Sequence, residues 1–190
     1  MSNPKPPKPA RPIANFFYTD SGLLEEALVA LDKRLGDRCF TSEPVSFDIT
    51  DYYVREMGAG IMRIFAAWKK LVDPFELVDI KLLTWEIEEK LKAGGKGRPV
   101  NIDPGIIAEG HMILATGKSS GHRPYVGRGV SFDLTLVYHE GSYRPQVWTY
   151  LDYAGDDIIS MMNGLRADYL KDLRNMENAI EPDPSTGGNK

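Results

Sequence analysis

Residues 13–36, IANFFYTDSGLLEEALVALDKRLG, decide the fold, because a strand and a helix follow each other directly within them. The segment IANFFY (13–18) is short and apolar and is bounded by TDSG (19–22), which predicts a strand that ends at a helix start. The leucines and alanines of 23–31 then recur at helical spacing, and Gly36 is placed to cap the helix. The sequence therefore predicts a β-α unit here.

A second helix is predicted over residues 73–94. The segment DPFE (73–76) offers Asp73 as N-cap, Pro74 at the first helical position, and Glu76 to complete a capping box. Before it, alternating apolar residues predict a strand over 44–53. The segment MRIFAAW (62–68) predicts another strand, although its apolar spacing also fits a helix.

The second half of the chain is rich in strand signals. Strands are predicted over 99–102, 111–116, 124–127 and 132–138, separated by turns with Gly and Pro, and an amphipathic helix is predicted from Asp156. This order predicts an α+β protein. We expect a ferredoxin-like β-α-β-β-α-β core with an extended, mainly antiparallel sheet and a C-terminal helix.

The chain of 190 residues suits a single domain between two tails. Residues 1–12 contain five prolines and three basic residues, which predicts a disordered Pro-rich leader. The single α+β domain is expected over 13–178. A disordered tail is expected over 179–190, where the composition is polar and rich in Pro and Gly.

Composition excludes several classes of protein. Hydrophobic residues make up 42% and charged residues 26%, which is typical of a folded globular protein. The sequence shows no apolar stretch near the ~18 residues of a membrane span, and residues 1–12 are not an apolar signal segment. These observations predict a cytoplasmic protein without a membrane partner. One cysteine and three scattered histidines do not have the spacing of zinc ligands.

Basic residues gather in one part of an otherwise acidic chain. Residues 110–132 contain no Asp or Glu, whereas the formal net charge of the whole chain is −4. A positive island of this kind predicts an anion-binding loop, with Lys118, His122 and Arg123 as ligand-binding candidates. The segment TGKS (116–119) is similar to the end of a phosphate-binding P-loop, but Met112 stands where that motif needs Gly.

Carboxylates stand near this basic loop in the predicted order of elements. In NIDPG (101–105), alternation places Asn101 and Asp103 on one side of a strand. The segment makes a turn, and it also fits a Mg²⁺ ion that bridges Asp103 to a phosphate. Glu56 stands before a Gly-containing turn. It is expected either to pair internally with Arg63 or to act with Asp103 as a metal ligand and catalytic residue.

Two further segments carry open alternatives. In WTYLDY (148–153), the aromatic rings could stack on a base or cover the end of the sheet, and Tyr150 and Asp152 are ligand-binding candidates. The segment EIEEK (86–90) has the E-x-E-x-K pattern of enzymes that hydrolyse triphosphates within a β-tunnel. That chemistry needs a strand, and this segment lies in a predicted helix, so a charged helix face is favoured.

The segments ITDYYVREMG, RPVNIDPG, ILATGK, HRPYVGRGV and WTYLDY resemble a bacterial domain-of-unknown-function family of about this length. The resemblance extends from about Ile13 to Leu170, with departures at Trp85 and Leu151. Some members of that family are labelled GTP-binding. The resemblance therefore implies a nucleotide as one kind of ligand.

The leading hypothesis is a protein that binds a small phosphorylated molecule, such as a nucleotide with Mg²⁺, with phosphate hydrolysis or transfer as the reaction class. Asp103 and Glu56 are the catalytic and metal candidates. The ligand-binding candidates are Arg98, Asn101, Lys118, His122, Arg123, Tyr150 and Asp152. One alternative is RNA binding by an open sheet face, against which the sequence pI near 5.4 argues. The other is a non-catalytic interaction module whose leader recruits a partner.

Overall fold

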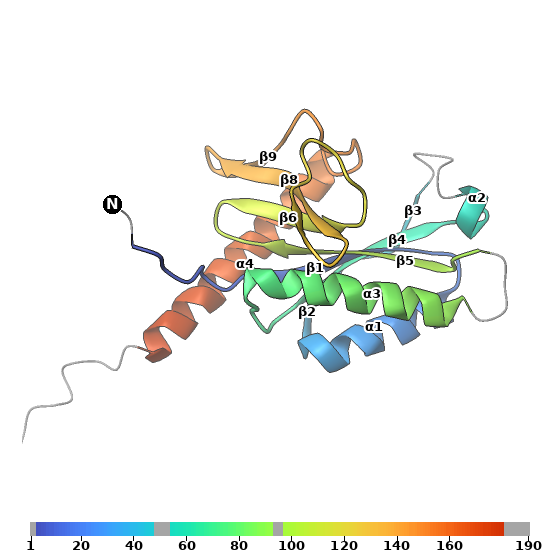
Figure 1. The fold of residues 1–190 in the computed structure, drawn as a ribbon, viewed down its shortest axis with the longest axis horizontal. Helices are drawn as coiled ribbons and strands as arrows, with labels where there is room; N and C mark the ends of the chain where they lie inside the picture. The colour runs from blue at the N-terminus through green and yellow to red at the C-terminus, as the bar shows by residue number, and fades with distance from the viewer. Residues whose placement is uncertain (1–2, 48–53, 93–96, 181–190) are drawn as a thin grey trace, which may run out of the picture.

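The computed structural model describes residues 3–47, 54–92 and 97–180, which form an α+β fold as predicted. Figure 1 shows its elements in space. In chain order they are β1 (Arg11–Tyr18), α1 (Ser21–Leu35), β2 (Arg38–Thr41), β3 (Val45–Ser46), α2 (Val54–Met57), β4 (Met62–Trp68), a 3-10 turn (Pro74–Glu76), α3 (Leu77–Leu91), β5 (Val100–Ile107), β6 (His111–Thr116), β7 (Tyr125–Gly127), β8 (Val130–His139), β9 (Ser142–Pro145) and α4 (Asp156–Ile180).

One extended sheet connects all the described strands. The main order is β2-β4-β1-β5-β6-β8-β7, with β3 paired to β4 and β9 paired to β8. Each pairing among the described strands is antiparallel. The extended antiparallel sheet and the C-terminal helix are therefore confirmed.

Helices cover both faces of the sheet. Strand β1 alternates between them: Ala14 and Phe16 face a core shared with α1 and α3, whereas Ile13 faces a core shared with α4. Figure 1 shows α1 and α3 side by side below the sheet, with α4 behind it. Helix α4 thus packs on the sheet face opposite to that of α1 and α3.

The predicted domain boundaries need correction at both ends. Strand β1 begins at Arg11, and Ala10 pairs with Val72, so residues 10–12 belong to the sheet and not to the leader. A buried arginine fits this strand because its charge is paired: Arg11 NH2 donates to Asp172 Oδ2 of α4 at 2.6 Å. At the other end, α4 runs to Ile180, past the expected boundary at 178. Residues 181–190 lie outside the described part of the chain.

Several local predictions are resolved by the structure. Both halves of the capping box form: Phe75 N donates to Asp73 Oδ1 at 2.8 Å, and Asp73 N donates to Glu76 Oε1 at 3.2 Å. Helix α3 ends at Leu91, and residues 93–94 of the predicted helix lie outside the described residues. MRIFAAW forms β4, not a helix. Of the strand predicted over 44–53, Val45–Ser46 forms β3, and 48–53 are not among the described residues.

Candidate functional site

The sheet opens between β5 and β6. Their pairing spans Gly105–Ile107 and Met112–Leu114, after which β6 continues along β8 alone. At the last pair the strands approach closely, because a Cβ on Gly105 would lie 2.5 Å from the Ile113 carbonyl oxygen. Beyond this point, a pocket of about 670 Å³ is lined by residues of both strands.

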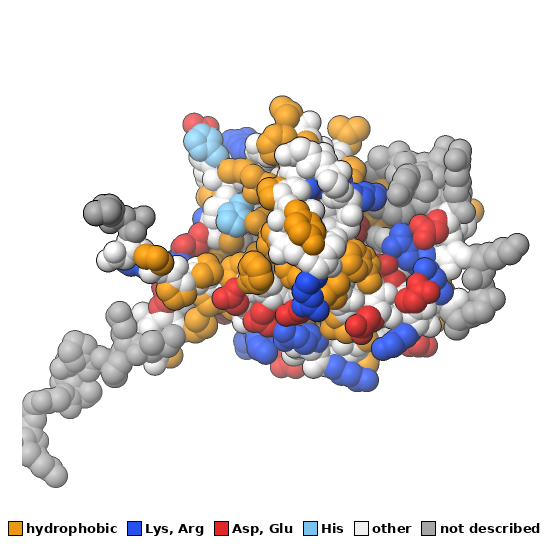
Figure 2. Space-filling view, in the orientation of Figure 1, with side chains coloured by type: hydrophobic (Ala, Val, Ile, Leu, Met, Phe, Trp, Pro, Cys, Tyr) orange, Lys and Arg blue, Asp and Glu red, His pale blue; other side chains and the backbone are white. Residues whose placement is uncertain are grey.

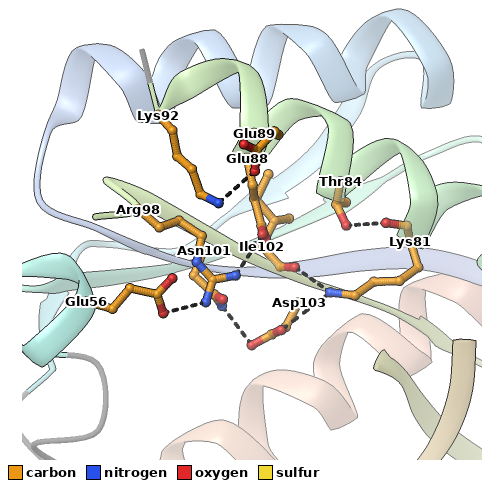
Figure 3. A network of polar contacts seen from close by, with 10 residues as sticks. All are labelled: Glu56, Lys81, Thr84, Glu88, Glu89, Lys92, Arg98, Asn101, Ile102 and Asp103. Atoms are coloured by element: carbon orange, nitrogen blue, oxygen red, sulfur yellow. Dashed lines mark hydrogen bonds and ion pairs between the residues drawn. The ribbon is translucent and has the colours of Figure 1, made fainter. Parts of the chain in front are cut away.

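Side chains of α3 take the place of the missing strand partner. Ile102 N of β5 donates to Glu88 Oε1 at 2.7 Å, and Lys81 Nζ donates to the Ile102 carbonyl oxygen at 3.1 Å. Figure 3 shows both side chains reaching from the helix to the strand. Buried backbone groups need partners, so these two contacts make the opening in the sheet tolerable.

Glu88 is a buried carboxylate of α3 next to the pocket residues Lys81 and Arg98. Burial raises the pKa of its carboxyl, and the positive charges of Lys81 and Arg98 oppose that shift. Arg98 donates to Glu88 at 2.8 Å and to Glu56 at 3.1 Å, and it lies between the two carboxylates in Figure 3. The favoured interpretation of 86–90 as a charged helix face therefore holds for exposed Glu86 but is wrong for Glu88.

Glu56 does not take the position that the sequence suggested. Its exposed carboxylate pairs with Arg98, not with Arg63, and it is not among the residues that line the pocket. Arg63 instead donates from Nε to Asn15 Oδ1 at 3.1 Å and lies 3.3 Å from Asp152 Oδ2. Arg63 and Glu56 therefore belong to two different ion pairs, Arg63 with Asp152 and Glu56 with Arg98.

Four Lys and Arg side chains among the described residues line this one pocket, and they come from different segments. Lys81 belongs to α3, Arg98 precedes β5, Lys118 follows β6, and Arg123 precedes β7. Three carboxylates line the same pocket: Asp103, Asp133 and Asp152. The lining thus carries both signs of charge, and its cations are the more numerous.

Arg123 is held in place by two acceptors. Its Nε donates to Asp133 Oδ2 and its NH2 donates to the Tyr150 hydroxyl, each at 2.8 Å. Burial lowers the pKa of Arg123, but the bonds to Asp133 and Tyr150 outweigh that effect and raise it. The guanidinium is therefore a fixed positive charge at the pocket wall.

The structure brings most of the predicted site residues to this pocket. Those that line it are Arg98, Asn101, Asp103, Lys118, Arg123, Tyr150 and Asp152. His122, like Glu56, is not part of the lining. Its ring stacks on Trp148 with centroids 5.5 Å apart, and its Nδ1 shares a hydrogen bond of 3.0 Å with Ser120 Oγ. The contacts with Ser120 and Trp148 therefore hold the ring of His122 in a position outside the lining of the pocket.

The carboxylates offer only a partial metal site. Among the described residues, no group of three or more His, Cys, Asp or Glu side chains is placed to hold a metal ion. Asp103 lines the pocket, and its Oδ2 accepts a hydrogen bond from Asn101 Nδ2 at 3.1 Å. A single carboxylate fits a Mg²⁺ ion whose other ligands are phosphate oxygens and water.

Sequence reasoning missed several residues of the lining, including Lys81, Asp133, Asn15 and Tyr153. Lys81 had a signal, because it interrupts the apolar run of α3 at a position that the helix buries. Asp133 had a similar one within the apolar strand β8. A charged residue at a buried position of an element points to a partner across the core.

Comparison with known proteins gives one match. Residues 8–169 match the model of the family described as Domain of unknown function (DUF4416). No curated protein and no solved structure matches the chain. In the part of the chain that the structure describes, no helix is both long enough and apolar enough to cross a membrane.

Proposed function

This chain belongs to the domain-of-unknown-function family DUF4416, and we propose that it binds a small phosphorylated molecule in the pocket between β5 and β6. The observation that carries the proposal is the convergence of Lys81, Arg98, Lys118 and Arg123 on one pocket. Such cations form charge-assisted hydrogen bonds with phosphate oxygens. A volume of about 670 Å³ is within the ~300–1,000 Å³ of small-molecule sites.

The phosphate is expected at the end of the pocket formed by Lys118 and Arg123. Lys118 is exposed, whereas Lys81 is buried and donates to β5. Arg98 could assist from the neighbouring wall, because its buried Nε has no hydrogen-bond partner among the described residues. Two cations with a third donor suit the several oxygens of one phosphate group.

Magnesium enters the proposal through Asp103. Mg²⁺ is commonly held by one or two carboxylates together with substrate phosphates. Asp103 is the carboxylate we assign to it, and Glu56 is omitted because its carboxylate pairs with Arg98 outside the lining. When bound, the ion would polarise a phosphoryl oxygen, which is the chemistry that hydrolysis or transfer of phosphate requires.

The test is a thermal-shift panel of nucleotides and phosphorylated metabolites, with and without Mg²⁺. A compound present at 100 times its Kd should add about 2.7 kcal/mol to the free energy of unfolding. Lys118→Ala should weaken the binding of that compound about tenfold. Lys171→Ala, which removes an exposed lysine of α4, is the matched control and should change nothing. Phosphate release in the same samples reports turnover.

Two outcomes contradict the proposal. Either no phosphorylated compound stabilises the protein, or Lys118→Ala and Lys171→Ala bind the active compound equally well. The first outcome would exclude phosphorylated compounds as ligands, and the second would exclude this pocket as their binding site.

RNA is the second candidate, favoured by exposed aromatic rings beside Arg123. Tyr150 is 47% exposed and accepts from Arg123, and Tyr125 is 70% exposed in the neighbouring β7. On the face shown in Figure 2, however, charges of both signs are interspersed over α1 and α3, where a phosphate backbone would need a basic stripe. Salt-sensitive retention of an RNA oligonucleotide, without any shift from small phosphates, would favour this candidate.

We also infer a ferredoxin-like core within the larger sheet. The segment β1-α1-β2-β4-α3-β5 has its strands in the spatial order β2-β4-β1-β5, which supports this inference. Strands β6–β9 and α4 would then be additions to the core. The pocket would lie where the additions join it. An experimental structure with another order of these four strands would contradict the inference.

A further inference from the structure

Two buried side chains of the pocket lining, Asn15 and Tyr153, and their buried neighbour Arg63 hold donor groups that make no well-formed hydrogen bond among the described residues. Asn15, Arg63 and Tyr153 are only 1%, 4% and 3% exposed. Asn15 Nδ2, Arg63 NH2 and the Tyr153 hydroxyl make no hydrogen bond of standard geometry among the described residues, although Asn15 lies close enough to Tyr153 to interact with its hydroxyl. Asn15 and Tyr153 line the pocket. Buried donors without well-placed acceptors are unfavourable, so the two that line the pocket, on Asn15 and Tyr153, indicate a group that arrives from outside.

The neighbours of each donor fix its role. Asn15 Oδ1 accepts from Arg63 Nε, so the amide must turn its Nδ2 donor elsewhere. Arg63 NH1 faces Asp152, and the guanidinium lies over the rings of Phe65 and Tyr153, so Arg63 holds its two polar neighbours in place. Burial raises the pKa of Tyr153 well above its ordinary value, against smaller opposing effects of Arg63 and of a hydrogen bond from Asn15. The phenol therefore keeps its proton and remains a donor.

Acceptors lie beside these donors. Asp103 and Asp152 both line the pocket. Burial raises the pKa of Asp152, Arg63 opposes that shift, and the negative charge of Asp103 adds to it. A second phosphate at this wall would face two carboxylates. A neutral group that both donates and accepts hydrogen bonds would satisfy Asp152 together with the donors of Asn15 and Tyr153.

Aromatic rings also line the pocket. Phe17, Trp85 and Tyr150 are among its lining residues. Rings of this kind supply apolar surface for the C–H faces of a ligand, while a few polar groups fix its orientation. Alternating donors and acceptors beside aromatic rings match a sugar or polyol better than a purely apolar ligand.

We propose that the inner wall, made of Asn15, Asp152 and Tyr153 and supported by the buried Arg63 that contacts Asn15 and Asp152, binds the vicinal hydroxyl groups of a pentose or polyol phosphate. The inference rests on the proposed function, because the phosphate is taken to lie at Lys118 and Arg123. The same hydroxyls occur in free sugar phosphates and in nucleotides. The substrate class is thus a phosphate ester that carries neighbouring hydroxyls.

The experiment compares ribose 5-phosphate, AMP and pentyl phosphate by titration calorimetry on the full chain. Ribose 5-phosphate, AMP or both should bind at least tenfold more tightly than pentyl phosphate, and the tighter of the two identifies the source of the hydroxyls. Tyr153→Phe should weaken binding of that compound about fivefold, with the affinity for pentyl phosphate unchanged. Tyr169→Phe is the matched control, because its hydroxyl donates to Pro9 O at 2.9 Å and does not line the pocket.

A second variant keeps the inference testable if Tyr153→Phe does not fold. Asn15→Asp keeps an acceptor for Arg63 Nε and removes the amide donor. It should also reduce the difference in affinity between the hydroxylated ligands and pentyl phosphate. Equal affinity for all three compounds would overturn the inner-wall assignment and leave the proposed function standing. So would hydroxyl selectivity that neither variant reduces. Absence of binding by every compound would overturn the proposed function itself.

Discussion

At the scale of single residues, Glu88 shows how one carboxylate can hold a strand and two cations together. It is 4% exposed, accepts from Ile102 N, and faces Arg98 and Lys81. Its pKa is raised because burial penalises the charge more than both cations favour it. The indispensable contact is therefore the hydrogen bond to the strand, which a neutral acceptor can also make.

This reasoning predicts different results for two substitutions of Glu88. Glu88→Gln keeps an acceptor for Ile102 N and should remain within about 1 kcal/mol of the parent in free energy of unfolding at pH 7. Glu88→Ala leaves a buried N–H and a gap, and should lose about 3 kcal/mol. Urea unfolding measures both values. Equal losses would show that the charge, and not the acceptor, is what the fold needs.

The pH dependence of Glu88→Gln provides a check with a definite sign. Because the folded pKa of Glu88 lies above its ordinary value of 4.5, the folded protein binds more protons than the unfolded chain between those two values. The contribution of Glu88 to stability therefore falls as pH rises through that window. Glu88→Gln should remove this decrease of stability with rising pH. Glu86→Gln, on the exposed side of the same helix, should keep it.

At the scale of elements, the junction of β5 and β6 sets the closed end of the pocket. Gly105→Ala would place a Cβ 2.5 Å from the Ile113 carbonyl oxygen and 2.8 Å from Leu114 Cδ2. The strands would have to part, with a loss of about 2 kcal/mol in stability. Gly110→Ala, in the turn between the same strands, meets no atom within 4 Å and should change the free energy of unfolding by less than about 0.5 kcal/mol. A calorimetric melt of both variants compares them directly.

Elements defined by neighbouring residues could be predicted, and those defined by distant ones could not. The capping box of Asp73 and Glu76 is local, so DPFE located the start of the helical segment. Strand β2 has few apolar residues, and it forms because β4 offers a paired edge. Likewise, Arg11 reads as part of a basic leader until Asp172, distant in sequence, supplies its partner.

The candidate site follows the same rule. Lys118 and Arg123 were found because charge signals mark them within a few residues of sequence, whereas the turn predicted at 103–105 is wrong, since Asp103 lies within the paired strand β5. Arg63 and Lys81 lie within apolar elements, and their partners depend on how β4 pairs with β1 and how α3 packs on β5. Sequence thus indicated three of the pocket's cations and its carboxylates Asp103 and Asp152, but not the buried residues Asn15, Lys81 and Tyr153.

At the scale of the whole molecule, segments from the two ends of the described chain are joined. Arg11 of β1 pairs with Asp172 of α4, and Lys8 contacts Glu177 of the same helix at 3.1 Å. Arg11 is 1% exposed, so its charge depends on this partner. The last helix is therefore fixed to the first strand as well as to the sheet face.

Removing the partner of Arg11 tests this connection. Asp172→Ala should lower the free energy of unfolding by about 2 kcal/mol, less than the ~3–5 kcal/mol of a fully buried pair, because Asp172 is 36% exposed. Asp168→Ala, one turn away with an exposed partner in Lys171, should change it by less than about 0.5 kcal/mol. The midpoints of urea unfolding, compared at equal m-values, measure the difference in the free energy of unfolding. Similar losses in both variants would refute the role of the buried cation.

The opening between β5 and β6 also bears on how the protein avoids association with other extended chains. A strand edge with bare N–H and C=O groups is a template on which a foreign strand can add. At Ile102 both groups are already occupied, one by Glu88 and the other by Lys81. The gap in the sheet is therefore accessible to a small molecule but has no free bonding groups at Ile102 for an invading peptide.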